Sequence, residues 1–169
     1  MAADKEVMNL SKPIRLAAVF AAATLLLPLS GCATRANGGY YYEKCKEIGV
    51  EIAFFTPETD LSSYAEIADC IFGTGFRSVP TGIYADAINK INSSDAYVVS
   101  VDINSGLNGD SGLTTLAVKS DLTVSIGTVK GGLVLGMARD YAKRVVNCNI
   151  GIGLIDTPYH LIEENDVKS

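Results

Sequence analysis

The sequence predicts an α/β fold built around a mostly parallel sheet, and two observations support this prediction. Short apolar runs rich in β-branched residues, such as YVVSV at 97–101 and LTVSI at 122–126, are typical of buried strands. Before the first of these runs, apolar residues recur with a helical period, at positions 83, 87, 88 and 91. The resulting order of strand, helix and strand predicts right-handed βαβ units, within one domain for a chain of 169 residues.

Composition narrows the class of function. Hydrophobic residues make up 48% of the chain and charged residues 20%, which is typical of a globular protein. The formal net charge of −5 argues against a nucleic-acid partner and fits a small molecule or a cation. The four cysteines form no CxxC pair, and His160 is the only histidine, so the spacing of a zinc site is missing from the sequence.

The N-terminal residues 1–32 are interpreted as a signal-peptide-like leader. Lys12 and Arg15 precede an apolar run at 16–27, which is too short to cross a bilayer comfortably. Leu29-Ser30-Gly31-Cys32 follows and resembles the bacterial lipobox, in which the cysteine is lipidated. Residues 33–39 are then expected to form a short tether. The alternative is that the apolar run forms a buried first helix of the domain.

The remaining elements are predicted in chain order. Residues 40–48 have helical spacing and end at Gly49, and residues 50–55 form a strand closed by Pro57. A second strand covers 67–72 and carries Asp69 within an apolar run. After the helix and the strands already named, residues 145–150 form the last strand.

Polar residues follow three of these strands. Asp69 and a Gly-Thr-Gly turn follow one, Asp102 and Ser105 another, and Lys130 the third. Because parallel neighbours bring their carboxyl ends to one edge of the sheet, we expect these residues to meet there. Oxygen donors without His or Cys suit a hard cation, whereas the nearby Arg77 and Lys130 suit an anionic cofactor or substrate. The alternative is that Asp69 caps a turn and Lys130 is solvated.

Four motifs together resemble the YjeF N-terminal domain family, the NAD(P)H-hydrate epimerases. They are ADCIFGTGFRS, VVSVDINSGLNGDSG, SDLTVSIGTVKGGLVLG and the ending NIGIGLIDTPYHLIEENDVKS, and the resemblance covers residues 40–169, a partial domain. It implies a Rossmann-like three-layer fold and an isomerase that interconverts the R and S hydrates of NADH and NADPH in nicotinamide repair.

The resemblance also implies roles for individual residues. The family binds one potassium ion, and Asp69 and Ser105 match two of its ligands. Asp102 matches the aspartate that contacts the reacting nicotinamide portion, and it is the acid/base candidate for proton transfer at the C6 hydroxyl. A further loop matches the one that holds the phosphates and ribose of the hydrate. It consists of Gly73, Thr74, Gly75, Phe76, Arg77, Ser78 and Val79.

The sequence departs from the family at its front. The family's GNNGGDG loop has only Asn37-Gly38-Gly39 as a counterpart, followed by Tyr40 where an aspartate would stand. The fold is therefore expected to lack the first strand or strands of the family. This leaves a second hypothesis open, namely a catalytically impaired or non-catalytic remnant or binding domain carried as a lipoprotein.

Partners and location follow from the same two hypotheses. The ending resembles the linker that leads to an ADP-dependent dehydratase domain in bifunctional members, so an ADP/ATP-dependent NAD(P)H-hydrate dehydratase is an expected partner. The family role implies the cytoplasm, whereas a lipid anchor at Cys32 implies the cell envelope. The oligomeric state stays open, with a homodimer as one option.

Overall fold

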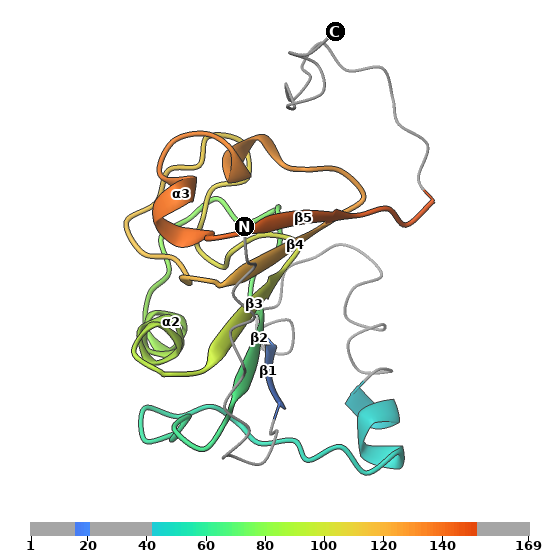
Figure 1. Ribbon diagram of the computed structural model, residues 1–169. Helices are drawn as coiled ribbons and strands as arrows, with labels where there is room; N and C mark the ends of the chain where they lie inside the picture. Colours follow the sequence, from blue (N-terminus) through green and yellow to red (C-terminus); the bar gives the residue numbers. More distant parts are fainter. Residues whose placement is uncertain (1–15, 21–41, 152–169) are drawn as a thin grey trace, which may run out of the picture.

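A computed structural model describes residues 16–20 and 42–151. Its centre is a five-stranded, entirely parallel sheet in the order β1-β2-β3-β4-β5 (Figure 1). The strands are β1 (Leu16–Phe20), β2 (Glu66–Cys70), β3 (Tyr97–Val101), β4 (Leu122–Ile126) and β5 (Val145–Cys148). The helices are α2 (Ile83–Asn92), α3 (Ala138–Tyr141), the 3₁₀ turn η2 (Gly131–Leu133), and a short helix at 42–47. The α/β, Rossmann-like prediction is confirmed.

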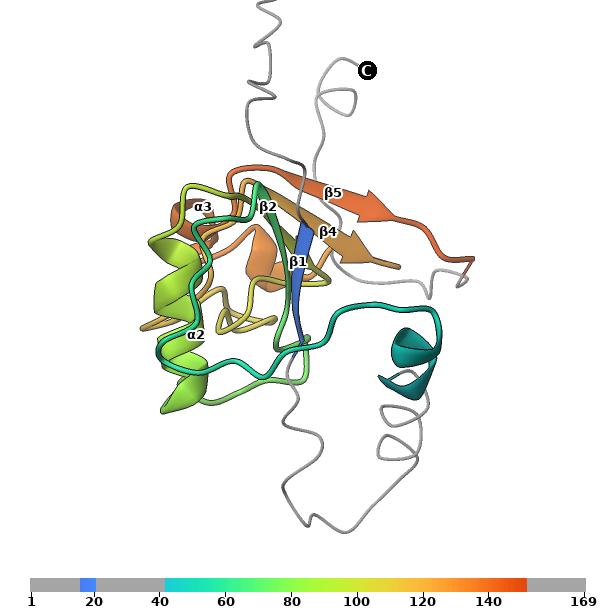
Figure 2. The same cartoon turned by 90° about the horizontal axis from the view of Figure 1, so that it is seen from below.

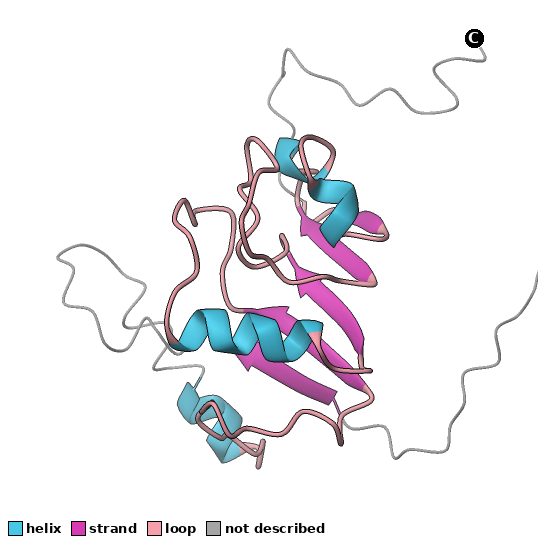
Figure 3. Ribbon diagram, turned by 90° about the vertical axis from the view of Figure 1, so that its left-hand side faces the viewer, coloured by secondary structure: helices cyan, strands magenta, loops and turns pink. Residues whose placement is uncertain are grey.

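One face of the sheet is buried by α2. Ala87, Ile88 and Ile91 of this helix belong to the same apolar cluster as Ile67 of β2 and Val98 of β3. The helical period therefore predicted the buried face of α2 correctly, except that Ile83 at its first turn is exposed. Figures 2 and 3 show α2 and α3 on the same side of the sheet. The predicted three-layer fold has helices on both faces of the sheet. Among the residues described, α2 and α3 do not cover the second face.

The buried positions of the central strands change from apolar to polar toward their carboxyl ends. Alternate residues point into the core, as the period of a strand requires. In β2 the buried residues are Ile67 and then Asp69, and in β3 they are Val98 and then Ser100. The sheet therefore places buried polar groups near the carboxyl ends of its strands.

The segment at 50–55 differs from its prediction as a strand. It follows the helix at 42–47, which agrees with the predicted helix, but has no regular structure. Val50, Ile52 and Phe54 have the alternation of a strand, yet all three are exposed. A strand needs a hydrogen-bonded neighbour, and in the structure this segment has none among the named strands.

Strand β1 comes from the apolar run that the sequence analysis assigns to a leader. It pairs in parallel with β2, from Leu16 opposite Glu66 to Phe20 opposite Cys70. A strand therefore precedes β2 in the sheet. The rest of the predicted leader and tether, including Cys32 and 37–39, lies outside the described residues, as does the C-terminal ending with His160. Across 16–20 and 42–151, no helix is both long and apolar enough to span a membrane.

Candidate functional site

The carboxylate of Asp69 lies at the end of β2, inside the protein. It is fully buried, and four neutral donors hydrogen-bond to it. Ser105 donates twice, from its hydroxyl at 2.5 Å and from its backbone N–H at 2.9 Å. The Ser100 hydroxyl donates at 2.8 Å and the Ile71 N–H at 3.3 Å. The register that places Ser100 opposite Asp69 makes the contact between β2 and β3 possible.

These donors do not neutralise the charge of Asp69. Desolvation by burial raises the pKa of this carboxyl, while the hydrogen bonds from Ser105, Ser100 and Ile71 oppose that rise. Its described contacts include no cationic side chain. An ionised carboxylate in such a place is stabilised by a bound cation. The oxygen of Phe72 lies 3.4 Å from the Ser105 hydroxyl, so carboxylate, hydroxyl and carbonyl oxygens meet here.

Asp102 follows β3 directly and has an uncommon backbone. Its φ is 73°, the left-handed region that few residues other than glycine adopt. The backbone N–H of Asp102 continues the ladder by donating to Val124 of β4 at 2.8 Å. The left-handed turn directs the side chain toward the glycine turn after β2, where Thr74 N–H lies 3.4 Å from Oδ2. Loops after two neighbouring strands therefore meet at this carboxylate.

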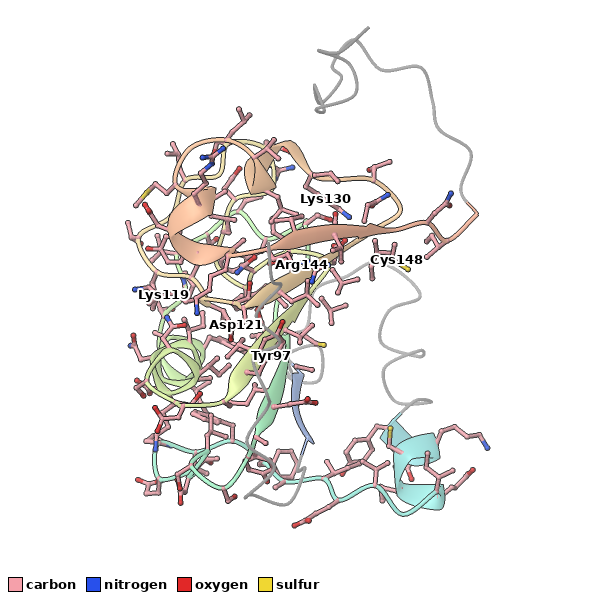
Figure 4. All side chains as sticks on the ribbon, in the orientation of Figure 1. Tyr97, Lys119, Asp121, Lys130, Arg144 and Cys148 are labelled. Atoms are coloured by element: carbon pink, nitrogen blue, oxygen red, sulfur yellow. The ribbon has the colours of Figure 1, made fainter. Side chains whose placement is uncertain are left out.

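Lys130 completes this group from the loop after β4. Its Nζ forms an ion pair with Oδ1 of Asp102 and donates to the carbonyl oxygen of Ile126 at 2.6 Å. The side chains are only 16% and 24% exposed, for Lys130 and Asp102 respectively, so water screens the pair weakly. Figure 4 shows Lys130 toward the carboxyl ends of the strands and Asp121 toward their amino ends.

The loop at 73–79 borders a pocket of about 380 Å³. The ring of Phe76 stacks on that of Phe72, with centroids 4.0 Å apart, which fixes the loop against the end of β2. The opposite wall comes from the loop after β3. The lining residues are Phe76, Arg77, Ser78, Val79, Gly106, Asn108, Ser111, Leu113, Thr114 and Thr115. Arg77 itself pairs with Asp110 of the opposite wall.

The expected convergence of three strand ends is therefore present. Asp69 contacts Ser105, and Asp102 contacts both Thr74 and Lys130. The structure does not bring Arg77 to either carboxylate. The sequence analysis missed Ser100 as a partner of Asp69, although a serine inside an apolar strand was a usable signal. It named Lys130 but not its contact with Asp102.

Among the residues described, no group of three or more His, Cys, Asp and Glu side chains is arranged to hold a metal ion. Any cation at Asp69 would therefore depend on hydroxyl and carbonyl oxygens as further ligands. This donor set has the all-oxygen chemistry of a hard cation site.

A family model described as "YjeF-related protein N-terminus" matches residues 23–132, which is more than half of the chain. The match begins before residue 40, within the predicted leader, and it includes the turn after β2, the loop after β3 and Lys130.

The individual relatives that match this chain are named as NAD(P)H-hydrate epimerases or repair enzymes. The NAD(P)H-hydrate epimerase of Limosilactobacillus reuteri is 43% identical over 98 residues, covering 55% of this chain and 46% of that protein. That of Levilactobacillus brevis is 39% identical over 95 residues, covering 56% and 44%. The bifunctional NAD(P)H-hydrate repair enzyme Nnr of Thermofilum pendens is 30% identical over 134 residues, covering 75% and 25%. The matched part of the chain thus spans less than half the length of these relatives.

Proposed function

This chain belongs to the family of YjeF-related N-terminal domains, and we propose that it acts as an NAD(P)H-hydrate epimerase. It would interconvert the R and S hydrates of NADH and NADPH, which makes it an isomerase of nicotinamide repair. The relatives at 39–43% identity carry this name, which supports the activity. The observation that carries the proposal is the oriented carboxylate of Asp102, which lies beside the glycine turn at the carboxyl edge of the sheet.

Asp102 would be the catalytic acid/base. The two hydrates differ in configuration at the carbon that bears the hydroxyl, so inversion requires a bond at that carbon to break and form again. When the hydroxyl loses its proton, the bond from this carbon to the ring nitrogen can break, with its electron pair moving to the nitrogen, and an open-chain aldehyde forms. Reclosure on the other face of the aldehyde restores that bond and returns the proton to the oxygen, so a group that takes this proton and gives it back accelerates the inversion. Asp102 is 24% exposed, which leaves its carboxylate reachable from solvent. About four acceptor positions exist on a carboxylate, and its described contacts use two of them.

The turn after β2 would bind the rest of the hydrate. Residues 76–79 of this turn line the pocket and include the Ser78 hydroxyl and Arg77, which are groups that bind phosphate and ribose oxygens. Gly73 lies beside Asp102, since a Cβ there would meet Oδ2 at 3.6 Å, an ordinary contact distance. This arrangement would place the phosphates in the pocket and the nicotinamide portion toward Asp102.

Potassium would bind at Asp69 and Ser105. The fit rests on the buried carboxylate, whose described partners are all neutral, and on the oxygens of Ser105 and Phe72 beside it. When bound, the ion would supply positive charge next to Asp69 and keep the loops after β2 and β3 together. Ser105 also accepts the Phe72 N–H at 2.8 Å, so one hydroxyl already links both loops.

A second function is favoured by the sequence around residue 37. Tyr40 follows Asn37-Gly38-Gly39 where the family has an aspartate. A non-catalytic binding domain, anchored in the cell envelope by lipid at Cys32, is consistent with these facts. The epimerase proposal instead places the protein in the cytoplasm with an ADP/ATP-dependent dehydratase as partner.

The two functions are separated by an epimerisation assay on the purified chain. The R hydrate is supplied in potassium buffer, and formation of the S hydrate is followed by chromatography. We expect acceleration over the uncatalysed rate, and a loss of about 100-fold or more in Asp102→Asn, since positioned proton transfer is worth that much. Asp95→Asn, in an exposed turn before β3, is the matched control and should retain the rate.

Equal rates with and without wild-type protein would contradict the epimerase proposal. Ligand binding without turnover would favour the binding domain. Mass spectrometry of the mature N-terminus tests the anchor separately, because lipidation would leave Cys32 as the first residue.

A further inference from the structure

We propose that Lys130 is a positioning residue, which holds the carboxylate of Asp102 in the orientation needed for proton transfer. The proposal rests on the epimerase function for its kinetic consequences, but its structural part stands on the geometry around Asp102. Neither the family match nor the names of the relatives assign a role to this lysine.

Lys130 connects the ends of two strands. Its ammonium contacts Oδ1 of Asp102, directly after β3, and the carbonyl oxygen of Ile126, the last residue of β4. An ammonium has three hydrogens, and two of them are used by these acceptors. Because the carbonyl fixes the ammonium from one side, Lys130 is a localised charge and not a freely moving side chain.

The conformation of Asp102 needs such support. A residue other than glycine at φ 73° is strained and persists where its surroundings determine it. Three contacts from three segments do so here. The backbone N–H donates to Val124, Oδ1 pairs with Lys130, and Oδ2 faces the Thr74 N–H. Removing Lys130 takes away the only charged one of these three.

The pairing leaves an oxygen for the substrate. The Thr74 N–H lies at 3.4 Å from Oδ2, near the outer limit of a hydrogen bond, so Oδ2 keeps acceptor capacity. Oδ1 is held by Lys130 on the side of β4. We therefore assign Oδ2 as the atom that receives the hydroxyl proton. The same oxygen returns the proton, so the carboxylate is unchanged after each turnover.

Other charged groups near Asp102 have partners of their own. Asp69, at the end of β2, is bonded to Ser100 and Ser105. Arg77, in the same loop as Thr74, pairs with Asp110. Within the described part of the chain, Lys130 is thus the cation that contacts the carboxylate of Asp102.

Two readouts test the proposal. The first is kinetic and compares Lys130→Met with Lys130→Arg, which keeps the charge. We expect kcat to fall about tenfold or more in the methionine variant with little change in KM, and the arginine variant to recover part of the loss. Lys143→Met is the matched control, since Lys143 forms another Lys–Asp ion pair, with Asp121 at the amino edge of the sheet.

The second readout is independent of activity. The position of the Asp102 carboxylate is determined in crystal structures of the wild type and the variants without substrate. The carboxylate should move away from the Thr74 N–H in Lys130→Met and keep its place in Lys143→Met. If the methionine variant does not fold, Lys130→Gln replaces it, because its amide still donates a hydrogen bond to Ile126.

The outcomes separate the two proposals. If the wild-type protein does not epimerise the hydrate, the proposed function fails and the position of the Asp102 carboxylate alone decides the role of Lys130. An unchanged position in a folded Lys130→Met variant overturns the proposal. In an active protein, an unchanged kcat in Lys130→Met overturns it as well.

Discussion

Asp69 and Asp102 follow neighbouring strands yet occupy opposite environments. Asp69 is buried among neutral donors, and desolvation raises the pKa of its carboxyl. Asp102 is partly exposed and paired with a lysine. Carboxyl groups in unlike environments suit unlike tasks, which supports the proposal that Asp69 binds the cation and Asp102 transfers the proton. The difference between the two environments arises because neighbouring strands place different side chains beside each carboxylate.

The proposed potassium site predicts a stabilising effect of this ion. An ion that binds at Asp69 binds the folded chain and not the unfolded one, so the midpoint of thermal unfolding should rise with the potassium concentration. At 100 times the dissociation constant, the gain in the free energy of unfolding is about 2.7 kcal/mol. The measurement compares potassium chloride with choline chloride at equal ionic strength.

Asp69→Asn supplies the control for this effect. It keeps the size of the side chain but lacks the charge, so its unfolding midpoint should be the same in both salts. A wild-type midpoint that is insensitive to potassium would remove the ion from the site. Equal potassium effects in wild type and variant would place the ion elsewhere.

The sequence predicted the positions of these residues better than their partners. Asp69 lies within an apolar strand, so its burial followed from local pattern. The contact between Asp102 and Lys130 joins residues 28 positions apart, through two loops whose path no local pattern specifies. Arg77 pairs with Asp110, a contact that the sequence did not indicate, and its expected contact with an anionic cofactor or substrate stays a prediction. The roles of all these residues in binding and catalysis remain predictions.

The loops after β3 and β4 are joined by contacts between their backbones. Gly132 in η2 donates its N–H to the oxygen of Gly109 at 2.8 Å, and Met137 donates to Gly112 at 2.9 Å. This approach needs glycine. A Cβ at position 132 would lie 2.1 Å from the backbone oxygen of Asn108. Because η2 begins directly after Lys130, the contact also sets where that lysine lies.

Adjacent glycines of η2 provide a test of this packing. Gly132→Ala should destabilise the protein by about 2 kcal/mol or more, since the clash is with backbone and has no flexible side chain to move. Gly131→Ala is the control, because its Cβ would meet the Asp110 oxygen at an ordinary 3.5 Å. Urea unfolding measures both. Similar losses in the two variants would show that helical geometry of η2, and not the close approach, limits substitution.

Elements with local signals were predicted well, and those without them were not. The apolar period of α2 and the short runs of β3 and β4 were each sufficient. The run at 16–20 has the composition of a leader and of a strand alike, and its pairing with β2 is a long-range contact. Residues 50–55 are the opposite case. Their apolar alternation is typical of a strand, but the segment pairs with no neighbouring strand and its alternating apolar side chains are exposed.

One lysine–aspartate pair lies at the carboxyl ends of the strands and another lies at their amino ends. Lys130 and Asp102 lie at the carboxyl edge, where the candidate site is, and Lys143 and Asp121 lie at the amino edge. Asp121 accepts the Lys143 ammonium at 2.6 Å and the Val98 N–H at 2.9 Å. It thereby ties the start of β3 to the segment before β5. This second pair is far from the proposed chemistry, so its role is in stability.

The pair at the amino edge makes stability depend on pH. Desolvation raises the pKa of Asp121, but the hydrogen bonds from Lys143 and Val98 outweigh it, so the pKa lies below the usual 3.8. An acid whose pKa is lowered by folding stabilises the folded state above its ordinary pKa. That contribution is lost as the pH falls through the lowered value. Asp121 therefore favours the folded state at neutral pH and loses this effect in acid.

Asp121→Asn tests this dependence, because the amide oxygen still accepts the Val98 N–H while the charge is gone. The unfolding midpoint of the variant should lie a few degrees below that of the wild type at pH 7. The difference should shrink as the pH falls below 3.8, where the wild-type carboxyl becomes protonated too. Lys143→Met should follow the same course, since it removes the other member of the pair. A difference that stays constant down to acid pH would assign the loss to hydrogen bonding and packing of Asp121, and not to its charge.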